Sequence, residues 1–151
     1  MRRILISSVV LAVLSTGLWG CAIFDKGPKA EELVMQQTRA FANDFLAGNA
    51  DKILDYVSAD FTSEHVESKA ALAEHIKEAK DSGKAAAFAQ LIKDHHGEID
   101  LKEAKVKIEK GIATVSPITA SADEGSVIVD LSFKRDPDKV WRIVGINVDT
   151  F

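Results

Sequence analysis

The chain has 151 residues, and its 19 basic and 23 acidic side chains give a formal net charge of −4 at pH 7. Two of the basic residues stand among the first three positions, and the others form no basic stripe. Nucleic acid and anionic lipid surfaces bind proteins through clustered Lys and Arg, so we expect neither as a partner. The length suits one domain with a single hydrophobic core.

The start of the chain has the pattern of a secretory signal peptide. Arg2 and Arg3 precede an apolar run over 4–19, which is shorter than the roughly 20 residues of a transmembrane helix. The run ends in "LSTGLWGC", and this end resembles the lipobox of bacterial lipoproteins, in which the cysteine is lipidated and becomes the mature N-terminus. We therefore expect a signal peptide over 1–20 and a lipid anchor on Cys21.

Cys21 is the only cysteine, so it has no disulfide partner within the chain, whereas a lipidated cysteine needs none. The resemblance implies two or more acyl chains, which stable membrane attachment requires. It also implies a cell-envelope protein, on the outer membrane and facing the periplasm in a Gram-negative host, because Ala22 rather than Asp follows the cysteine. The alternative is an incidental thiol beside a signal peptide that is cut elsewhere. We expect the lipidated cysteine and a short tether over 21–30, and one domain over 31–151.

The domain begins with a segment that has the apolar period of an amphipathic helix. Val34, Thr38, Phe41 and Phe45 recur at intervals of four, three and four residues, so they share one face. Acidic residues stand in the first turn, where the helix dipole favours them, and Gly48 is typical of a helix end. The segment is therefore predicted to be a helix up to Gly48.

Shorter helical segments follow. Asn49 can cap a helix over 50–58, and Ser68 can cap another that runs to about residue 80. Segment 85–94 is helical in composition too, and it is either a separate helix or a continuation of the preceding one beyond Gly83. The first half of the domain is therefore predicted to be helical.

Beyond Gly97 the period of the apolar residues changes to that of strands. Segments 105–109, 112–120 and 126–134 have strand patterns and are separated by short turns. The last segment, 139–148, is apolar on most of both faces. Consecutive strands with short connections form an antiparallel meander, and helices that precede it cover one face. The predicted fold class is α+β, with N-terminal helices packed on an antiparallel sheet.

This arrangement resembles the nuclear transport factor 2-like superfamily, which includes ketosteroid isomerase and polyketide cyclases. The resemblance covers about residues 31–151 and is carried by the helix junction "AGNADKILDYVSADF" and the last-strand sequence "WRIVGINV", neither of which is a catalytic signature. It implies a cone-shaped, cystatin-like domain in which a curved sheet and the long helix enclose a pocket.

The resemblance also implies residues for the pocket. A gap-free alignment on the isomerase pattern puts Phe41 at the oxyanion-binding tyrosine, His65 at the general base and Asp130 at the aspartic acid that completes the oxyanion hole. A phenyl ring cannot donate that hydrogen bond, whereas an imidazole can act as a base near neutral pH. His65 and Asp130 are therefore the candidate catalytic residues. The pocket residues implied in this way are Phe41, Phe45, Tyr56, Phe61, His65 and Asp130.

Each of these residues also has an ordinary structural interpretation. Phe41 can be a core residue of the first helix, and His65 a loop histidine beside glutamates. Asp130 can be a solvated strand residue paired with a lysine on the neighbouring strand. Tyr56 can line the pocket or close the second helix. The sequence leaves these alternatives open.

The histidine and serine patterns do not indicate a metal centre or a nucleophile. His95 and His96 are adjacent, so a helix or strand points them in different directions, and no H-x-x-x-H or C-x-x-C spacing supports them. No serine stands in a G-x-S-x-G motif, and the sequence has no Gly-rich phosphate loop. The charged stretch 93–110 is interpreted as a solvated connection into the sheet and its exposed strand face. We expect no metal and no cofactor.

Three functions from different classes fit the sequence. The favoured one is a non-catalytic, lipid-anchored envelope protein whose domain binds a small apolar ligand. The alternative is an interaction module whose sheet face forms a homodimer or docks another envelope protein, which is suggested by Trp141, Val144 and Ile146 on a strand that is apolar on two sides. The third is an isomerase- or hydrolase-like enzyme with His65 as base.

Overall fold

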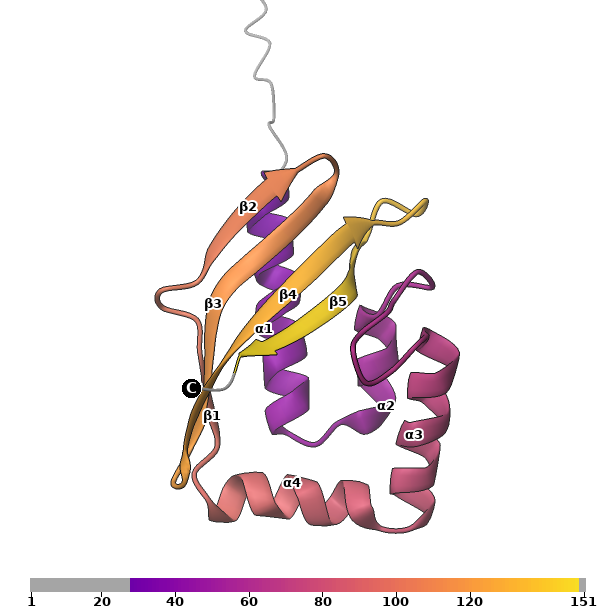
Figure 1. Cartoon of the computed structure of the whole chain (residues 1–151), viewed down its shortest axis with the longest axis vertical. Coiled ribbons are helices and arrows are strands. Elements are labelled where there is room, and N and C mark those ends of the chain that lie inside the picture. Colours follow the sequence, from indigo (N-terminus) through magenta and orange to yellow (C-terminus); the bar gives the residue numbers. More distant parts are fainter. Residues whose placement is uncertain (1–27, 150–151) are drawn as a thin grey trace, which may run out of the picture.

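The computed structural model describes residues 28–149, in which helices precede strands along the chain. The predicted signal peptide and the predicted anchor on Cys21 lie outside the described residues. In chain order the elements are α1 (Ala30–Leu46), α2 (Ala50–Ile53), the 3-10 helix η1 (Leu54–Tyr56), α3 (Lys69–Asp81), α4 (Lys84–Asp94), β1 (Glu98–Asp100), β2 (Lys105–Glu109), β3 (Ile112–Ala122), β4 (Gly125–Arg135) and β5 (Trp141–Asp149) (Figure 1).

α1 is the long helix that the apolar period predicts. The Glu32 carboxylate accepts a hydrogen bond at 3.3 Å from the backbone N–H three residues before it, which satisfies a free donor at the helix start. Val34, Thr38 and Ala42 are buried on one face. The chain leaves the helix at Gly48, whose φ of +71° is left-handed and costs glycine no strain.

The other helices differ in part from the prediction. Segment 50–58 forms α2 and η1, and the chain then turns at Val57 into an extended segment beside the sheet. The Ser68 hydroxyl accepts a hydrogen bond from the backbone N–H of Ala71 at 3.2 Å and caps α3, as predicted. Gly83, with φ +74°, separates α3 from α4, so the last helical segment is a separate helix.

The sheet is antiparallel and has the order β1–β3–β4–β5, with β2 paired to β3. One edge of β3 pairs with β4, and the other edge pairs with β2 along its first half and with β1 along its second half. β2 to β5 form the predicted meander. β1 was not predicted, because its residues lie in the charged stretch 93–110, which was interpreted as a connection into the sheet.

Alternate residues of β4 point to opposite faces of the sheet. Phe133 and Leu131 lie on the inner face, where they are buried in the core. The buried core is Val34, Val57, Phe61, Ala113, Val115, Ile118, Leu131, Phe133, Trp141 and Ile143.

The last strand is not apolar on both faces, which corrects the prediction. The register between β4 and β5 shifts next to Phe133, where β5 carries one extra residue, Val144. An extra residue changes the face to which the following side chains point. Trp141 and Ile143 before it and Ile146 after it therefore all belong to the inner face.

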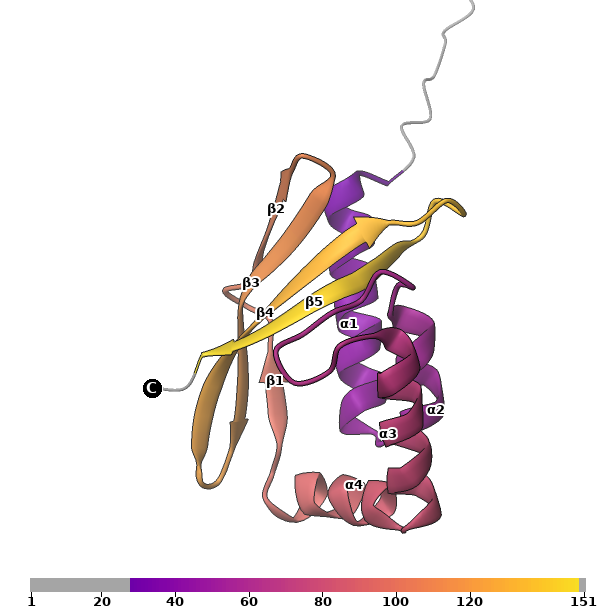
Figure 2. The same ribbon diagram turned by 45° about the vertical axis from the view of Figure 1, so that its right-hand side comes forward.

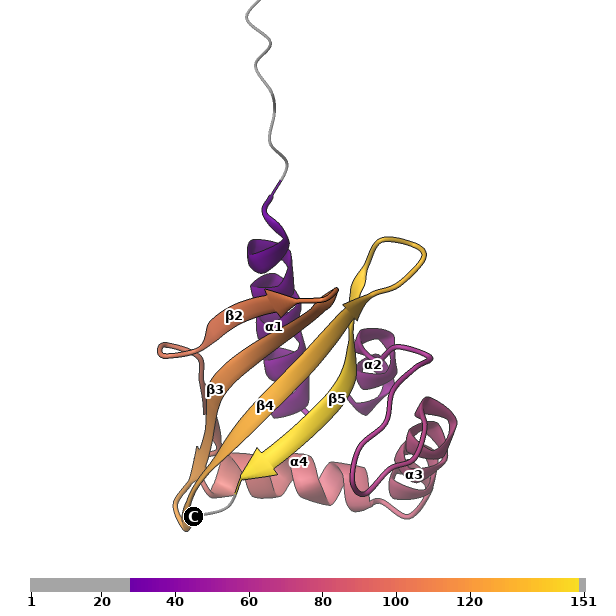
Figure 3. The same cartoon turned by 45° about the horizontal axis from the view of Figure 1, so that its top comes forward.

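The domain has two layers, the sheet on one side and the helices on the other (Figure 2). α1 runs along the inner face of the sheet, and α4 lies across the end of the domain that is opposite to the start of α1 (Figures 1 and 3). α4 lies close to the turn after α1, because a Cβ on Gly48 would overlap the Cβ of Ala89. Within residues 28–149, no helix combines the length and apolar character needed to cross a membrane.

Candidate functional site

A cavity of about 280 Å³ lies between α1 and the inner face of the sheet, and we call it the inner cavity. Four residues of one face of α1 form one wall, and alternate residues of the strands form the other. The lining residues are Thr38, Phe41, Ala42, Phe45, Ile99, Leu101, Ile118, Ala120, Val127, Val129, Leu131, Ile146 and Val148.

The local sequence explains why this part of the core is hollow. α1 presents the small Ala42 between larger residues, and β3 presents the small Ala120 on the facing wall. On the sheet, Ala120 is paired with Val127 of β4 and with Ile99 of β1, so the pairing surrounds it with branched side chains. Two alanines on facing walls leave room that larger side chains would fill.

The inner cavity is apolar throughout. Thr38 carries its one polar side-chain atom, and that residue is 1% exposed. Its hydroxyl donates a hydrogen bond to the Val34 carbonyl oxygen at 2.9 Å, so it is already satisfied. Among residues 28–149, every buried side-chain N or O atom has a hydrogen-bond partner. Cavities of this kind stay dry and accept apolar molecules.

Aromatic rings connect the inner cavity to the surface near α4. The ring centroids of Phe41 and Phe45 are 6.1 Å apart, and those of Phe45 and Phe88 are 5.7 Å apart. Tyr56 packs edge-on against Phe41, with the two ring centroids 5.9 Å apart. Spacings of this size are favourable for aromatic pairs.

Tyr56 supports Phe41 from behind and is not a lining residue. Its hydroxyl donates a hydrogen bond to an Asp44 carboxylate oxygen at 2.6 Å. This bond raises the pKa of Tyr56 to about 12, and it is also the largest cause that lowers the pKa of Asp44. Asn49 donates to the same carboxylate at 2.6 Å, so the hydroxyl is held at the turn after α1 and not aimed at the cavity.

The structure does not bring the two candidate catalytic residues together. His65 is exposed in the loop between η1 and α3, outside the residues that line the inner cavity. Asp130 lies on the outer face of β4, because the residues before and after it, Val129 and Leu131, line the inner cavity. His65 and Asp130 therefore do not share the inner cavity, contrary to the expectation from the sequence.

Asp130 is also not paired with a lysine on the neighbouring strand, which was its ordinary structural interpretation. Its carboxylate accepts a hydrogen bond from the Ser116 hydroxyl at 2.5 Å, and Asn147 lies opposite on β5. Phe61, another of the pocket candidates, is only 3% exposed and belongs to the packed core. Of the pocket candidates, Phe41 and Phe45 line the inner cavity.

The strand residues that form the sheet wall of the inner cavity were not assigned from the sequence. The alternation in β4 was visible and could have assigned Val127 and Val129 to the wall. Ile99 was missed because it stands in the charged stretch 93–110. Its apolar character between Glu98 and Asp100 was the available signal of a short strand.

The two adjacent histidines lie at the end of α4, beside the turn between β3 and β4. His95 pairs with Glu124, and the Nδ1 atom of His96 lies 3.1 Å from an Asp123 carboxylate oxygen. In the part of the chain that the structure describes, no three His, Cys, Asp or Glu side chains gather as metal ligands would. The histidines therefore join α4 to the sheet hairpin.

No protein-family model and no curated protein matches the sequence. Solved structures do match the fold. A candidate ketosteroid isomerase from Parabacteroides distasonis superposes with a TM-score of 0.56 at 13% identity, over 82% of this chain and 89% of that one. A nuclear transport factor 2-like protein with a cystatin-like fold from Novosphingobium aromaticivorans gives 0.53 at 16% identity, over 78% and 79%.

Bd1075 of Bdellovibrio bacteriovorus gives a TM-score of 0.54 at 8% identity over 78% of this chain. The match spans only 39% of the length of Bd1075, so the shared part is one portion of a longer protein. At these identities the comparisons establish architecture. The helices, the five-stranded antiparallel sheet and the matched structures together show that the chain has the nuclear transport factor 2-like, cystatin-like α+β fold.

Proposed function

We propose that the chain is a lipid-anchored envelope protein whose domain binds a small apolar molecule in the inner cavity and does not transform it. The observation that carries this proposal is the cavity itself. It encloses about 280 Å³ between α1 and the sheet, and its only polar side-chain group, the Thr38 hydroxyl, is satisfied within the helix. An apolar molecule gains from burial there, whereas a polar one would lose its hydrogen bonds to water.

The enzyme alternative is weakened by where the titratable groups lie. General acid–base catalysis needs a side chain within hydrogen-bond reach of the reacting atoms. Among the described residues that line the inner cavity, none is acidic, basic or a histidine. His65 is in an exposed loop, and Asp130 points to the other face of the sheet.

The interaction-module alternative loses the feature that suggested it. The extra residue in β5 places Trp141 and Ile146 on the inner face, so the apolar character of that strand serves the core. The outer face around Asp130 is mostly polar instead, with Ile128 as an apolar neighbour. Residues that share the outer face with it include Thr114, Ser116, Thr119 and Ser132. A second copy or a protein partner on this face remains a second outcome of the test below.

The membrane anchor is the part of the proposal that rests on the sequence. Cleavage before Cys21 and acylation of its thiol would hold the domain at the membrane surface by a tether of a few residues. Cys21→Ser removes the acceptor thiol. We expect this variant to lose labelling by palmitate, while Ser15→Ala, inside the predicted signal peptide, keeps it.

The ligand is tested by native mass spectrometry of the protein purified from its own envelope fraction. We expect a small molecule to be released on denaturation. Ala42→Leu, which fills the inner cavity, should lose it, and Ala86→Leu, at an exposed site on α4, should keep it. Empty protein of both variants and of the wild type would refute the proposal, and an empty dimer would favour the sheet-face alternative.

A further inference from the structure

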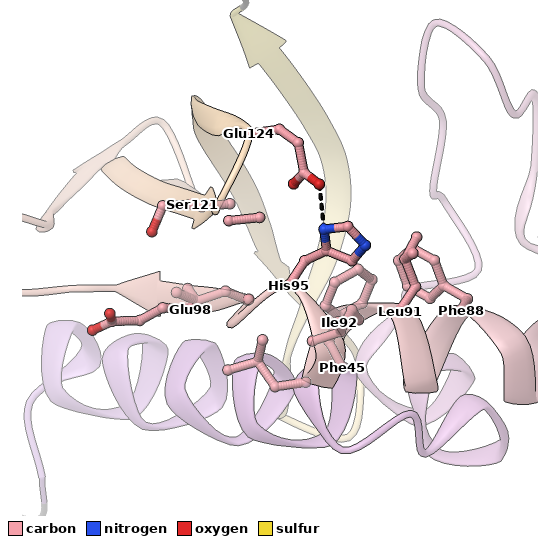
Figure 4. Close-up of a pocket in the computed structure, with 13 residues that line it drawn as sticks. Phe45, Phe88, Leu91, Ile92, His95, Glu98, Ser121 and Glu124 are labelled. Atoms are coloured by element: carbon pink, nitrogen blue, oxygen red, sulfur yellow. Dashed lines mark ion pairs between the residues drawn. The ribbon is translucent and has the colours of Figure 1, made fainter.

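A second apolar cavity of about 270 Å³ adjoins the inner cavity, and we call it the α4 cavity (Figure 4). The two cavities share Phe45, Ile99 and Ala120 as lining residues. Ile99 and Ala120 are paired across β1 and β3, so the sheet wall continues without a break from one cavity to the other. A third cavity between α2, α3 and α4 shares only Phe45 with the inner cavity.

The α4 cavity is apolar along its length and polar at one end. Phe88, Leu91 and Ile92 of α4 form the wall opposite the sheet (Figure 4). Phe88 and Leu91 are 47% and 52% exposed, which is unusual for side chains of this size unless something covers them. The polar end is formed by His95, which pairs with Glu124, whereas Glu98 and Ser121 alternate with Ile99 and Ala120 and point to the other face of the sheet (Figure 4).

We propose that both cavities are occupied by one ligand, a single unbranched hydrocarbon chain with an uncharged polar end, such as a long-chain alcohol. This inference rests on the proposed function and specifies its ligand class. A cavity of about 150 Å³ accommodates benzene, so the two cavities together hold roughly 20 carbon atoms.

The junction between the cavities favours a flexible chain over a rigid ring system. Phe45 lines both cavities, and its ring is held between those of Phe41 and Phe88. The two cavities are separate volumes that share this ring, so a ligand that occupies both must bend around it. A methylene chain can bend in this way, whereas a fused ring system of the same volume cannot.

The charges at the open end favour an uncharged polar group. Glu124 stands at this end, where its carboxylate is paired with His95. A fatty-acid carboxylate there would lie beside the Glu124 carboxylate and would be repelled. A hydroxyl group can instead donate to that carboxylate without this repulsion.

The experiment compares alcohols of two lengths on variants of the full chain, purified as the cell processes it and held in phospholipid nanodiscs. The probes are decanol, which fits the inner cavity alone, and octadecanol, which needs both cavities. Ala122 is exposed and lines only the α4 cavity, so Ala122→Trp blocks that cavity. Ala86→Trp, exposed on α4 and outside both linings, is the matched control.

Binding is measured by native mass spectrometry, and each variant is compared with wild type in identical nanodiscs, so that alcohol dissolved in the lipid cancels. Each buried methylene is worth about a fourfold change in affinity. We therefore expect Ala122→Trp to weaken octadecanol binding at least tenfold and to leave decanol binding within about twofold, while Ala86→Trp changes neither. Unchanged decanol binding also shows that the variant is folded.

Two results overturn the inference, and they are distinguishable. If octadecanol binds wild type and Ala122→Trp equally, the α4 cavity is not part of the site, and the proposed function stands with a shorter ligand. If neither alcohol binds wild type above empty nanodiscs, the proposed function fails as well. The polar end is tested with octadecanoate, whose binding should rise about threefold in Glu124→Gln and not in Glu103→Gln, an exposed site outside the cavity. Equal octadecanoate binding by both variants would refute the uncharged end.

Discussion

Replacing Ala42 by leucine should make the protein more stable and abolish ligand binding at the same time. Ala42 is 6% exposed on α1, and it faces the inner cavity of about 280 Å³. Leucine adds three carbon atoms to the empty space, and their burial is worth about 2.4 kcal/mol. Fixing the leucine rotamer costs about 0.5 to 1 kcal/mol, so the net gain is roughly 1.5 kcal/mol.

A gain of this size should raise Tm by about 6 °C in a domain of this length. Differential scanning calorimetry measures it on protein freed of bound small molecules and held in nanodiscs, because a ligand lost only from the variant would itself lower Tm; empty nanodiscs are the baseline. Ala86→Leu makes the same chemical change at an exposed site, so it should leave Tm within about 2 °C of wild type. Native mass spectrometry of the samples before ligand removal should show loss of the bound molecule only in Ala42→Leu.

The sign of the change in Tm distinguishes an empty space beside Ala42 from a packed one. A leucine forced into a fully packed core destabilises by about 1 to 3 kcal/mol, because neighbouring side chains leave their preferred rotamers. A fall in Tm for Ala42→Leu relative to Ala86→Leu would therefore mean that the space beside Ala42 is filled. Such a result would remove the physical basis of the ligand-binding proposal.

Two further predictions concern the hydrogen bond of Tyr56 behind Phe41 and the two glycines beside α4. The Asp44 hydrogen bond raises the pKa of Tyr56 to about 12, above its ordinary value of about 10. The stabilisation from this hydrogen bond is therefore complete below about pH 10 and is lost as the pH rises through about 12. Over that range the free energy of unfolding of wild type, measured with urea, should fall more steeply than that of Tyr56→Phe. An equal pH dependence in the two proteins would contradict the prediction. Gly48 and Gly83 both have positive φ, but an added Cβ meets nothing at Gly83 and overlaps Ala89 at Gly48. Gly48→Ala should therefore be at least about 2 kcal/mol less stable than Gly83→Ala in urea unfolding, and equal stabilities would show that α4 is free to move away from the turn.

Much of the fold was predictable because its elements have strong local signals. The face shared by Val34, Thr38 and Phe41 predicts α1, and the hydroxyl of Ser68 predicts the start of α3. In β4 the alternation of Leu131 and Phe133 with polar neighbours predicts which face meets the helix. Each of these signals lies within one element, so a single sequence contains it.

The features that were missed depend on pairs of elements. The extra residue Val144 in β5 exists only relative to β4, and it turns Ile146 to the same face as Ile143. A strict period of two therefore assigns the end of β5 to the wrong face. β1 is too short to have a period, and its strand character depends on pairing with β3.

The candidate site was predicted only on its helix side. Phe41 and Phe45 were found because the helix period places them on the buried face. The cavity itself depends on Ala42 and Ala120, which lie far apart in the sequence and face each other only in the fold. The alignment with isomerase residues assigned Asp130 to the pocket, and the alternation of β4 places it on the other face.

The length of α1 has a consequence for how a ligand would reach the domain. The helix has 17 residues and so is about 25 Å long, with Ala30 at one end of the domain and α4 across the other (Figure 1). The lipid proposed on Cys21 would be joined to the end at Ala30, and α1 would then act as a spacer between the bilayer and the open end of the α4 cavity. A ligand would then reach that end from the aqueous side and would not enter sideways from the membrane.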